Sequence, residues 1–487
     1  MQTGQLFSCP MFRYCLKKMR SRGIIAGILL CFSSCASYYQ KNLKFNTDFA
    51  SGQIERAKKD LDKSSKEAFK NNRYLYYVNQ GVVGQLLGDY RQSNEWFEKA
   101  YLFNEDFRKS FLEEGASFLV NDKLKTYTPE DHEQFYVLYY KAVNYIKLAK
   151  WDEALVECKR LISLTNVLSD KKKVKNKFRE DAFAHVLIGL VYDALRDYNN
   201  AFIAYRNALR IYENQYRPLF GIEAPRQLKE DLLRTAYLVG FYEELESYQK
   251  KFGMTYVPED NQQTGELVFL WNNGLGPVKT EWSLDFVIFP GGPGAVMFRN
   301  EDLGWAFPFP VGSGDKISLE KLRVVRIALP KYVERPLMFS GANLQAGSLQ
   351  SDFNLGEDVN IISRKLLSER MFLTVGKTLL RVALKQAASE QIRKKNQGWG
   401  VAANLLASFT EQADTRNWQT LPHSIYYTRM RLPEGEQEVQ LNLHSDFGSQ
   451  YNQKRTFKYN IRRGQTQFAA FSSLEVAPYF RSEKLEH

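Results

Sequence analysis

The feature that most constrains the fold is a spacing of small and large side chains that recurs three times between residues 81 and 208. In each copy, a small residue and a second residue three positions later precede a turn. Another small residue follows the turn, and two larger or apolar residues come after it. The copies run from Gly81 to Ala100, from Ala142 to Leu161 and from Gly189 to Ala208. Apolar residues at a period of 3.6, broken by short turns, predict α-helical hairpins.

This spacing resembles the tetratricopeptide repeat, in which small residues let the two helices of a hairpin approach and large residues fill the gap to the next hairpin. The resemblance implies a helical scaffold that binds another protein. Successive copies start 61 and 47 residues apart, whereas a regular array has a step of about 34 residues. We therefore expect additional helices between the repeats, within one helical domain over residues 46–256.

In such arrays the first helix of each repeat lines a concave face where peptides dock. We therefore expect a protein partner to contact this face. The residues that the spacing places there are Tyr136, Tyr139, Val143, Phe183, Val186 and Leu190. The alternative is that several of them belong to the core between helices, because aromatic and apolar stripes at helical spacing usually pack.

The first 34 residues predict a lipoprotein signal peptide. Basic residues at positions 13–22 precede an apolar run at 23–32, which is too short for a spanning helix, since that needs roughly 20 apolar residues. Residues 32–35, Phe-Ser-Ser-Cys, then resemble the lipobox of bacterial lipoproteins, in which the cysteine takes a diacylglycerol. The alternative is an ordinary cleaved signal peptide with an incidental cysteine.

The lipobox resemblance implies that residues 1–34 are removed, that Cys35 is lipidated and that residues 35–45 form a tether. Ala36 and Ser37 follow the cysteine, where an Asp would be the signal for retention in the inner membrane. We therefore expect an outer-membrane lipoprotein whose body faces the periplasm. Cys158 is the one cysteine beyond this region, so no structural disulfide is available and stability has to come from packing.

The net charge of the chain is +12, and basic residues before position 35 contribute +5 of it. The remaining bias is mild. It is compatible with an acidic protein partner or with anionic headgroups, and we predict no nucleic-acid partner.

Glycine and proline become more frequent after Pro258, where alternation replaces helical spacing, so a second domain is predicted over residues 262–487. Strand patterns lie at residues 266–271, 322–329, 425–432, 439–443 and 457–461. Helical spacing returns from Val359 to Lys395. We predict an antiparallel sheet or small sandwich with helices of residues 359–412 laid against it. The predicted fold class is α+β, a tetratricopeptide-like solenoid followed by a β-rich domain.

Two motifs stand out in this second half. They are residues 271–279, Trp-Asn-Asn-Gly-Leu-Gly-Pro-Val-Lys, and residues 413–422, Ala-Asp-Thr-Arg-Asn-Trp-Gln-Thr-Leu-Pro. They resemble an uncharacterised family of bacterial envelope lipoproteins with tetratricopeptide-like N-terminal halves. The resemblance covers most of the mature chain. It implies a role in cell-wall or outer-membrane assembly, because some members are encoded beside penicillin-binding-protein activator lipoproteins.

The sequence predicts no catalytic, metal or cofactor site. Its five histidines are scattered, and it has neither a Gly-x-Ser-x-Gly elbow nor a Walker motif. The most site-like group is Asp414, Arg416 and Trp418, because an acid, an arginine and an indole can together bind a sugar or a carboxylate. The alternative is an internal salt bridge and packing anchor.

The predicted function is therefore an anchored scaffold for another envelope protein, and not an enzyme. The alternative is a glycan-binding protein or a hydrolase that acts through the C-terminal domain. A cleft lined by paired carboxylates would favour this alternative, whereas an apolar groove in the solenoid would favour the scaffold.

Overall fold

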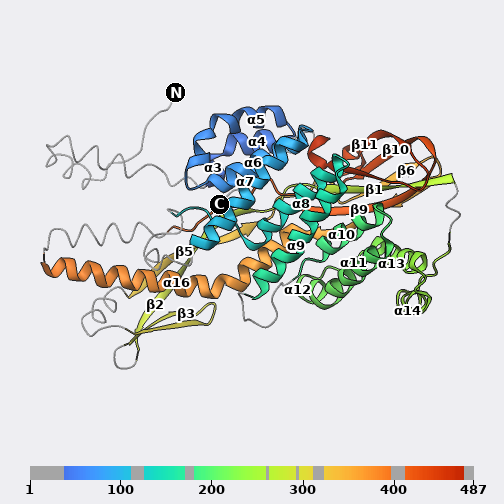
Figure 1. Cartoon of the computed structure of the whole chain (residues 1–487). Coiled ribbons are helices and arrows are strands. Elements are labelled where there is room, and N and C mark those ends of the chain that lie inside the picture. Colours follow the sequence, from blue (N-terminus) through green and yellow to red (C-terminus); the bar gives the residue numbers. More distant parts are fainter. Residues whose placement is uncertain are drawn as a thin grey trace.

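The computed structural model describes residues 38–110, 125–170, 180–258, 263–291, 295–310, 323–395 and 412–476. Cys35 and the predicted signal peptide lie outside these residues. Figure 1 shows a body of helices and sheets, from which another sheet and one long helix project. Within the described ranges, no helix is both long enough and apolar enough to span a membrane.

The N-terminal half consists mainly of antiparallel helix pairs joined by short turns. The helices are α3 (Tyr38–Lys41), α4 (Leu43–Ala50), α5 (Ile54–Lys63), α6 (Arg73–Leu86), α7 (Tyr90–Ser110), α8 (Asp131–Lys147), α9 (Trp151–Asp170), α10 (Ala182–Ala194), α11 (Tyr198–Ile211), α12 (Arg217–Phe220), α13 (Arg226–Val239) and α14 (Tyr242–Phe252). Helix α10 begins at an N-cap, where the Asp181 carboxylate accepts a hydrogen bond from the backbone N–H of Ala184. The pairs α6–α7, α8–α9 and α10–α11 are the three predicted repeats.

Glycines at the predicted small positions let the helices of a pair touch. A Cβ atom on Gly81 of α6 would lie 2.6 Å from the Phe97 ring of α7, and Gly189 of α10 leaves the same space for Tyr205 of α11. Such a distance is too short for any side chain, so only glycine permits this approach. The tetratricopeptide-like hairpins that the spacing predicts are therefore confirmed.

The described strands form three four-stranded sheets. Sheet A contains, in spatial order, β12 (Thr466–Ser472), β1 (Thr264–Asn273), β9 (Ser424–Pro433) and β8 (Asn354–Asp358). Sheet B contains β4 (Trp305–Pro310), β3 (Ala295–Asn300), β2 (Val278–Pro290) and β5 (Val324–Val333). Sheet C contains β11 (Gln453–Ile461), β10 (Gly435–His444), β6 (Gly341–Ala346) and β7 (Leu349–Asp352). Strands β1 and β12 pair in parallel, and the other described pairs are antiparallel.

The body has three layers because side chains alternate between the two faces of sheet A. On β1, Val268 and Leu270 pack against the helices, whereas Leu267, Phe269 and Trp271 pack against sheet C. Sheets A and C therefore form the predicted sandwich, and the helices cover the other face of sheet A (Figure 1).

The helical half and sheet A share one hydrophobic core. Apolar side chains of α8, α10 and α13 are buried in the same cluster as Ile425 and Tyr427 of β9. The change of composition near Pro258 therefore separates helices from strands, but it does not separate two cores.

Sheet B and helix α16 (Val359–Lys395) form an arm that projects from the body (Figure 1). The 37 residues of α16 span about 55 Å, and its bounds match the predicted helical segment. The prediction laid it against an antiparallel sheet or small sandwich, and the structure lays it against antiparallel sheet B and not against the sandwich of sheets A and C. Val375 and Leu379 of α16 instead share a core with Phe286 and Ile327 of sheet B, so the helix stabilises the arm.

The arm is joined to the body at Glu130, just before α8. The Lys279 ammonium of β2 donates a hydrogen bond to the Glu130 carboxylate at 2.7 Å, and Arg370 of α16 pairs with the same carboxylate. All three side chains are mostly buried or half-buried. Two ion pairs in a partly desolvated environment therefore hold the arm to the body.

Candidate functional site

The six residues predicted to bind a partner lie in the interior, between the helices and sheet A. Tyr136, Tyr139, Val143, Phe183, Val186 and Leu190 are each at most 4% exposed. The Tyr139 hydroxyl donates a hydrogen bond to the Asn272 side-chain oxygen at 2.9 Å. The Phe183 and Tyr427 rings have centroids 6.0 Å apart. Strands of the same chain thus occupy the concave face. In this structure the six residues therefore lie in the core, which is the alternative interpretation of their spacing.

The predicted polar group Asp414, Arg416 and Trp418 links the segment before β9 to the helices. Arg416 donates two hydrogen bonds to Asp414, at 2.8 and 2.6 Å, and a third to the Asn72 side-chain oxygen at 3.2 Å. The backbone N–H of Trp418 donates to the Glu133 carboxylate at 2.7 Å, and the indole is 1% exposed. In this structure, Asp414 and Arg416 therefore form an internal salt bridge, and Trp418 packs as an anchor between this segment and the helices.

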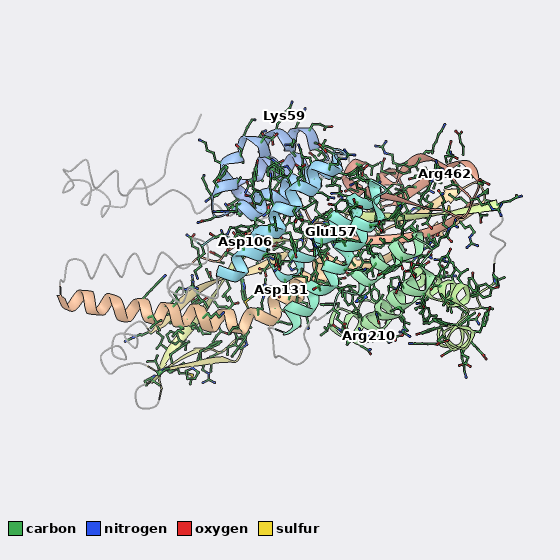
Figure 2. All side chains as sticks on the ribbon, viewed as in Figure 1. Lys59, Asp106, Asp131, Glu157, Arg210 and Arg462 are labelled. Carbon is green, nitrogen blue, oxygen red and sulfur yellow. The ribbon has the colours of Figure 1, made fainter. Side chains whose placement is uncertain are left out.

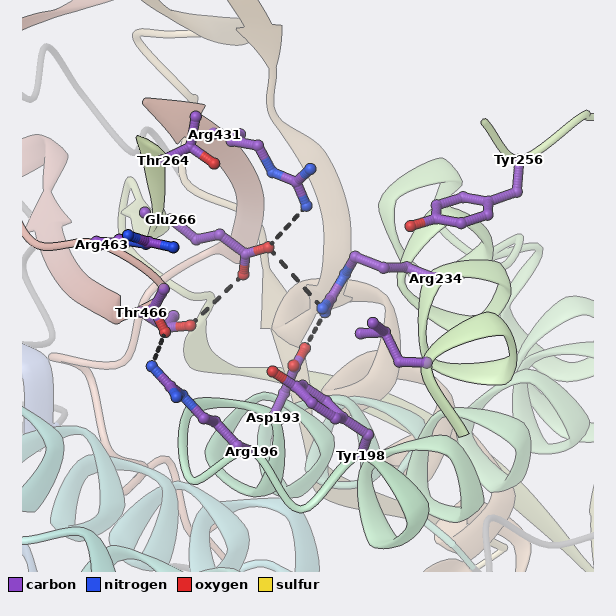
Figure 3. A pocket seen from close by; sticks show the side chains of 13 residues that line it. Asp193, Arg196, Tyr198, Arg234, Tyr256, Thr264, Glu266, Arg431, Arg463 and Thr466 are labelled. Atoms are coloured by element: carbon purple, nitrogen blue, oxygen red, sulfur yellow. Dashed lines mark hydrogen bonds and ion pairs between the residues drawn. The ribbon is translucent and has the colours of Figure 1, made fainter. Parts of the chain in front are cut away.

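A polar pocket lies where α10, α11 and α13 meet the ends of β1, β9 and β12. Its volume is about 360 Å³. Figure 3 shows its charged side chains pointing toward one another from both halves of the chain. They are Asp193, Arg196, Arg234, Glu266, Arg431 and Arg463.

Arginines hold both acids of the pocket. Arg429 donates a hydrogen bond to Asp193 at 2.7 Å, and Arg234 pairs with the same carboxylate. Glu266 pairs with Arg429 and lies 3.3 Å from Arg431 Nη2. Because buried charges are tolerated when they are paired and hydrogen-bonded, this network explains how five charged side chains fit between the helices and sheet A.

Alternation along the strands places these charges on the face that meets the helices. Glu266 lies two residues before Val268 on the helix-facing side of β1. On β9, Arg429 and Arg431 continue the face of Tyr427, and the register pairs Glu266 with Arg431. These charged side chains therefore lie beside the apolar side chains of the shared core, on the same face of sheet A.

The electrostatics of the network keep its acids bound to arginine. Asp231 of α13 accepts a hydrogen bond from Arg429 Nε at 2.7 Å. Burial raises the pKa of Asp231 to about 6, although Arg429 and Arg234 counteract it. Burial also opposes ionisation of Glu266, but Arg234 and Arg429 outweigh it and lower the pKa of this carboxyl. Glu266 is therefore ionised at neutral pH and has no proton to donate to a substrate.

The pocket wall has more arginine than acid, four side chains against two. Arg196 donates a hydrogen bond to the Gly464 carbonyl at 2.7 Å, and it forms no ion pair with an acid in the part of the chain that the structure describes. The Arg234 Nε atom is buried and has no hydrogen-bond partner among the described residues. Arg463 is exposed, and no acid in the described ranges pairs with it. A wall with a net charge of +2 favours an anionic ligand.

Metal binding and cysteine chemistry find no support in the described residues. No group of three or more His, Cys, Asp or Glu side chains in these ranges could hold a metal ion. Cys158 is buried, and burial raises the pKa of its thiol, which makes it a core residue and a poor nucleophile.

This pocket was not among the predicted sites, although β9 carries a signal for it. Ile425 and Tyr427 predict a buried strand face, and Arg429 and Arg431 continue that face at the same alternation. Arginines on a buried face require buried acids opposite them. The sequence does not reveal that these acids come from α10, α13 and β1, because those elements are distant along the chain.

No protein-family model and no curated protein sequence matches the chain. Solved structures that resemble its helical half include MamA, which is 16% identical over 42% of this chain and 90% of that chain, with a TM-score of 0.27. The apo form of RapI is 14% identical over 44% of this chain and 68% of that chain, with a TM-score of 0.32. BtubC from P. vanneervenii is 14% identical over 44% of this chain and 81% of that chain, with a TM-score of 0.30. Likeness this low carries no argument about function, so the repeat assignment rests on the helix pairs themselves.

Proposed function

We propose that the protein is a membrane-anchored scaffold of the cell envelope that binds an acidic group of another protein in the arginine-lined pocket. The observation that carries the proposal is the surplus of arginine over acid in a pocket built from both halves of the chain. Guanidinium groups present planar donors that bind a carboxylate through two hydrogen bonds. A volume of about 360 Å³ suits one acidic side chain or a chain end, since pockets of this size hold small groups.

Binding, and not catalysis, is the activity that the pocket supports. Both of its acids are ion-paired with arginine, so neither is free to act as a general acid or base. The paired carboxylates that would favour a hydrolase therefore have another role here, which is to hold the arginines in place. The shared core of helices and sandwich supports a scaffold, because it fixes the pocket on rigid elements.

The envelope location is a proposal from the sequence. Helix α3 begins at Tyr38, three residues after Cys35, so a diacylglycerol on Cys35 would hold the body close to the bilayer. We place the protein on the outer membrane, facing the periplasm, in cell-wall or outer-membrane assembly. This placement is supported by the lipobox and by the absence of an Asp after Cys35.

The anchor is tested by replacing the cysteine. Cys35→Ala should release the protein from membranes washed at high salt, which removes proteins held by charge alone. Cys158→Ala is the control, because it removes the buried cysteine of the body and should leave the protein on the membrane. Retention of the Cys35→Ala protein after the wash would contradict the anchor.

The pocket is tested with two neighbouring arginines. Arg463→Glu reverses a charge that lines the pocket, whereas Arg462→Glu makes the same change at an exposed neighbour that does not line it. Crosslinking in native envelopes should yield one stoichiometric protein partner with wild type and with Arg462→Glu, and about tenfold less with Arg463→Glu, since close charge reversals cost more than 1.4 kcal/mol. Equal yields from both variants, or recovery of muropeptides in place of a protein, would contradict the proposal.

A further inference from the structure

Strand β11 is an edge strand of sheet C. It pairs with β10 on one side, and no other described strand pairs with it. Figure 1 shows sheet C on the outer side of the body. In Figure 2, Arg462, the residue that follows β11, lies near the right-hand end of the body. An edge strand presents a row of backbone N–H and C=O groups with which another extended chain can pair.

The hydrogen bonds of sheet C show which backbone groups of β11 face outward. The Ser340 N–H donates a hydrogen bond to the His444 carbonyl at 2.9 Å, so the backbone groups of His444 point toward β6. Because these groups alternate in direction along a strand, those of Val439 point toward β11 and meet Phe457 there. The backbone groups that point away from β10 are therefore those of Lys454, Thr456, Lys458 and Asn460.

This outer edge is open along most of its length. All four outward residues are exposed. The Asn460 carbonyl accepts a hydrogen bond from the Gln467 side chain at 2.6 Å. In the described part of the chain, the backbone groups of Thr456 and Lys458 have no hydrogen-bond partner. An added strand would bond to these groups without displacing any described residue.

The charge of β11 favours an acidic partner. The strand contains Lys454, Arg455 and Lys458 and no acid, a net charge of +3. On the outer face of sheet C, the two lysines share the surface with Glu436 and Glu438 of β10. An added strand would lie on the other side of β11, about 4.8 Å from the lysines and twice as far from these acids. Acidic side chains on its outer face would therefore be direct cross-strand neighbours of the lysines.

A second copy of the chain fits this edge less well. Two β11 strands placed side by side would bring lysines against lysines, and like charges on neighbouring strands destabilise the pairing. Lysines on an edge strand are a common device against such self-association. The same lysines attract an acidic strand from another protein.

The inner face of β11 borders a cavity of about 360 Å³. Phe457 and Tyr459 are half-buried and line the cavity together with Tyr90 and Lys147. Because side chains alternate, an added strand that turns acidic residues to the outer face turns its other residues toward this cavity. Aromatic walls favour apolar or aromatic side chains at those positions.

The turn after β11 leads to the arginine-lined pocket, to which it contributes Arg463 and Gly464. We propose that an extended segment of a partner protein, in which acidic and apolar residues alternate, adds as a strand to the free edge of β11. In this mode of recognition, main-chain hydrogen bonds supply affinity, and sites for alternate side chains supply specificity. We take the segment to belong to the partner whose acidic group enters the pocket, so the inference rests on the proposed function.

The test uses the chain from residue 35 onward with Cys35→Ala, so that neither a signal peptide nor a lipid contributes. The probe is a fluorescent peptide as long as β11, nine residues, in which Glu alternates with Val and Phe. Its control has the same composition with the Glu residues grouped at one end. We expect the alternating peptide to bind about tenfold more tightly, because only its side chains match both faces of β11. Absence of binding, or equal binding of the two peptides, would overturn the proposal.

Thr456→Pro removes one outward donor of the edge. The Thr456 N–H points away from β10, so proline breaks no hydrogen bond of the sheet and is tolerated on such an edge. Thr456→Val is the matched control, because it keeps the N–H. We expect Thr456→Pro to weaken binding of the alternating peptide about tenfold and Thr456→Val to leave it unchanged. Equal binding by the two variants would overturn the proposal.

Hydrogen exchange of the unsubstituted edge keeps the proposal testable if Thr456→Pro does not fold. The alternating peptide should slow exchange of the Thr456 and Lys458 amides, because they become hydrogen-bonded. The Phe457 amide, which faces β10, is the internal control and should change little. Unaltered exchange at Thr456 and Lys458 in the presence of bound peptide would overturn the proposal.

The pocket variant separates strand addition from the proposed function. Crosslinking in native envelopes, as for Arg463→Glu, is repeated with Thr456→Pro. Loss of the partner with both variants supports strand addition. Loss with Arg463→Glu alone would overturn strand addition and leave the pocket in place, whereas loss with Thr456→Pro alone would support strand addition and contradict the pocket. A wild-type dimer in analytical ultracentrifugation that Thr456→Pro dissociates would overturn the proposal, because a second copy would then occupy the edge.

Discussion

At the scale of single residues, Glu133 of α8 connects three segments of the chain. Its carboxylate accepts hydrogen bonds from the Trp418 backbone N–H at 2.7 Å and from the Tyr127 hydroxyl at 2.6 Å. Burial and the nearby Glu130 raise the pKa of Glu133 to about 7, although Lys279 counteracts them. A buried carboxyl with a raised pKa makes stability depend on pH, because folded and unfolded chains bind its proton at different pH values.

Glu133 is expected to destabilise the protein as pH rises. Below its ordinary pKa of 4.5 both states hold the proton, whereas between 4.5 and about 7 the folded state alone holds it. Stability from this group is therefore present at low pH and is lost as pH rises toward 7, by roughly 3 kcal/mol in total. In urea titrations, the free energy of unfolding of Glu133→Gln minus that of wild type should increase by roughly this amount between about pH 4.5 and pH 7.5.

Comparison with the wild type isolates this effect. Burial lowers the pKa of His132 to about 4, so its contribution changes with pH in the opposite direction, but it is present in both proteins and cancels in the difference. Glu55→Gln, on an exposed surface of α5, is the matched control. A difference between Glu133→Gln and wild type that stays constant with pH would contradict the raised pKa.

At the scale of elements, local patterns in the sequence predicted where helices and strands lie along the chain. They did not predict which of these elements pack against each other. Helix α16 has the predicted bounds, and β9 contains the predicted strand 425–432. The pairing of β1 with β12 was not predicted, because Glu266 and its parallel partner Thr466 are 200 residues apart in the chain. The arginine-lined pocket could not be predicted for the same reason, since its side chains meet only through tertiary packing.

The first helix of the second repeat provides an element-scale test. As a free binding surface it would tolerate Tyr136→Ala with Tyr139→Ala without loss of stability. In the structure both rings are buried, and Tyr139 bonds to Asn272 of β1. We therefore expect each truncation to cost about 3–5 kcal/mol, as deletions of large buried aromatics do, and the double variant to melt well below wild type in circular dichroism.

The control for this pair is Tyr242→Ala on α14, where the side chain is 63% exposed. It should melt close to wild type, because little packing is lost. Near-wild-type melting of the Tyr136→Ala and Tyr139→Ala double variant would return this helix to the role of a free binding face.

At the scale of the whole molecule, one strand connects the arginine-lined pocket to the arm. Strand β1 starts at Thr264 beside the pocket and ends at Asn273, after which the chain enters β2 and the arm. Because β1 is packed between the helices and sheet C, the pocket has a fixed position relative to the root of the arm. This arrangement suits a scaffold that holds a bound partner in a fixed position relative to the rest of the chain.

The shared core predicts how the chain responds to cleavage between its helices and its strands. A specific protease site inserted between residues 260 and 261 would cut the connection without touching the described core. Separation of the fragments would expose Val268, Leu270 and Ile425, which are at most 1% exposed. Exposing each of these side chains to water would cost about 1.5–3 kcal/mol of free energy. We therefore expect the two fragments to elute together in size-exclusion chromatography and to unfold in one transition. Separate elution, or two independent transitions in calorimetry, would show that the boundary near Pro258 divides two cores.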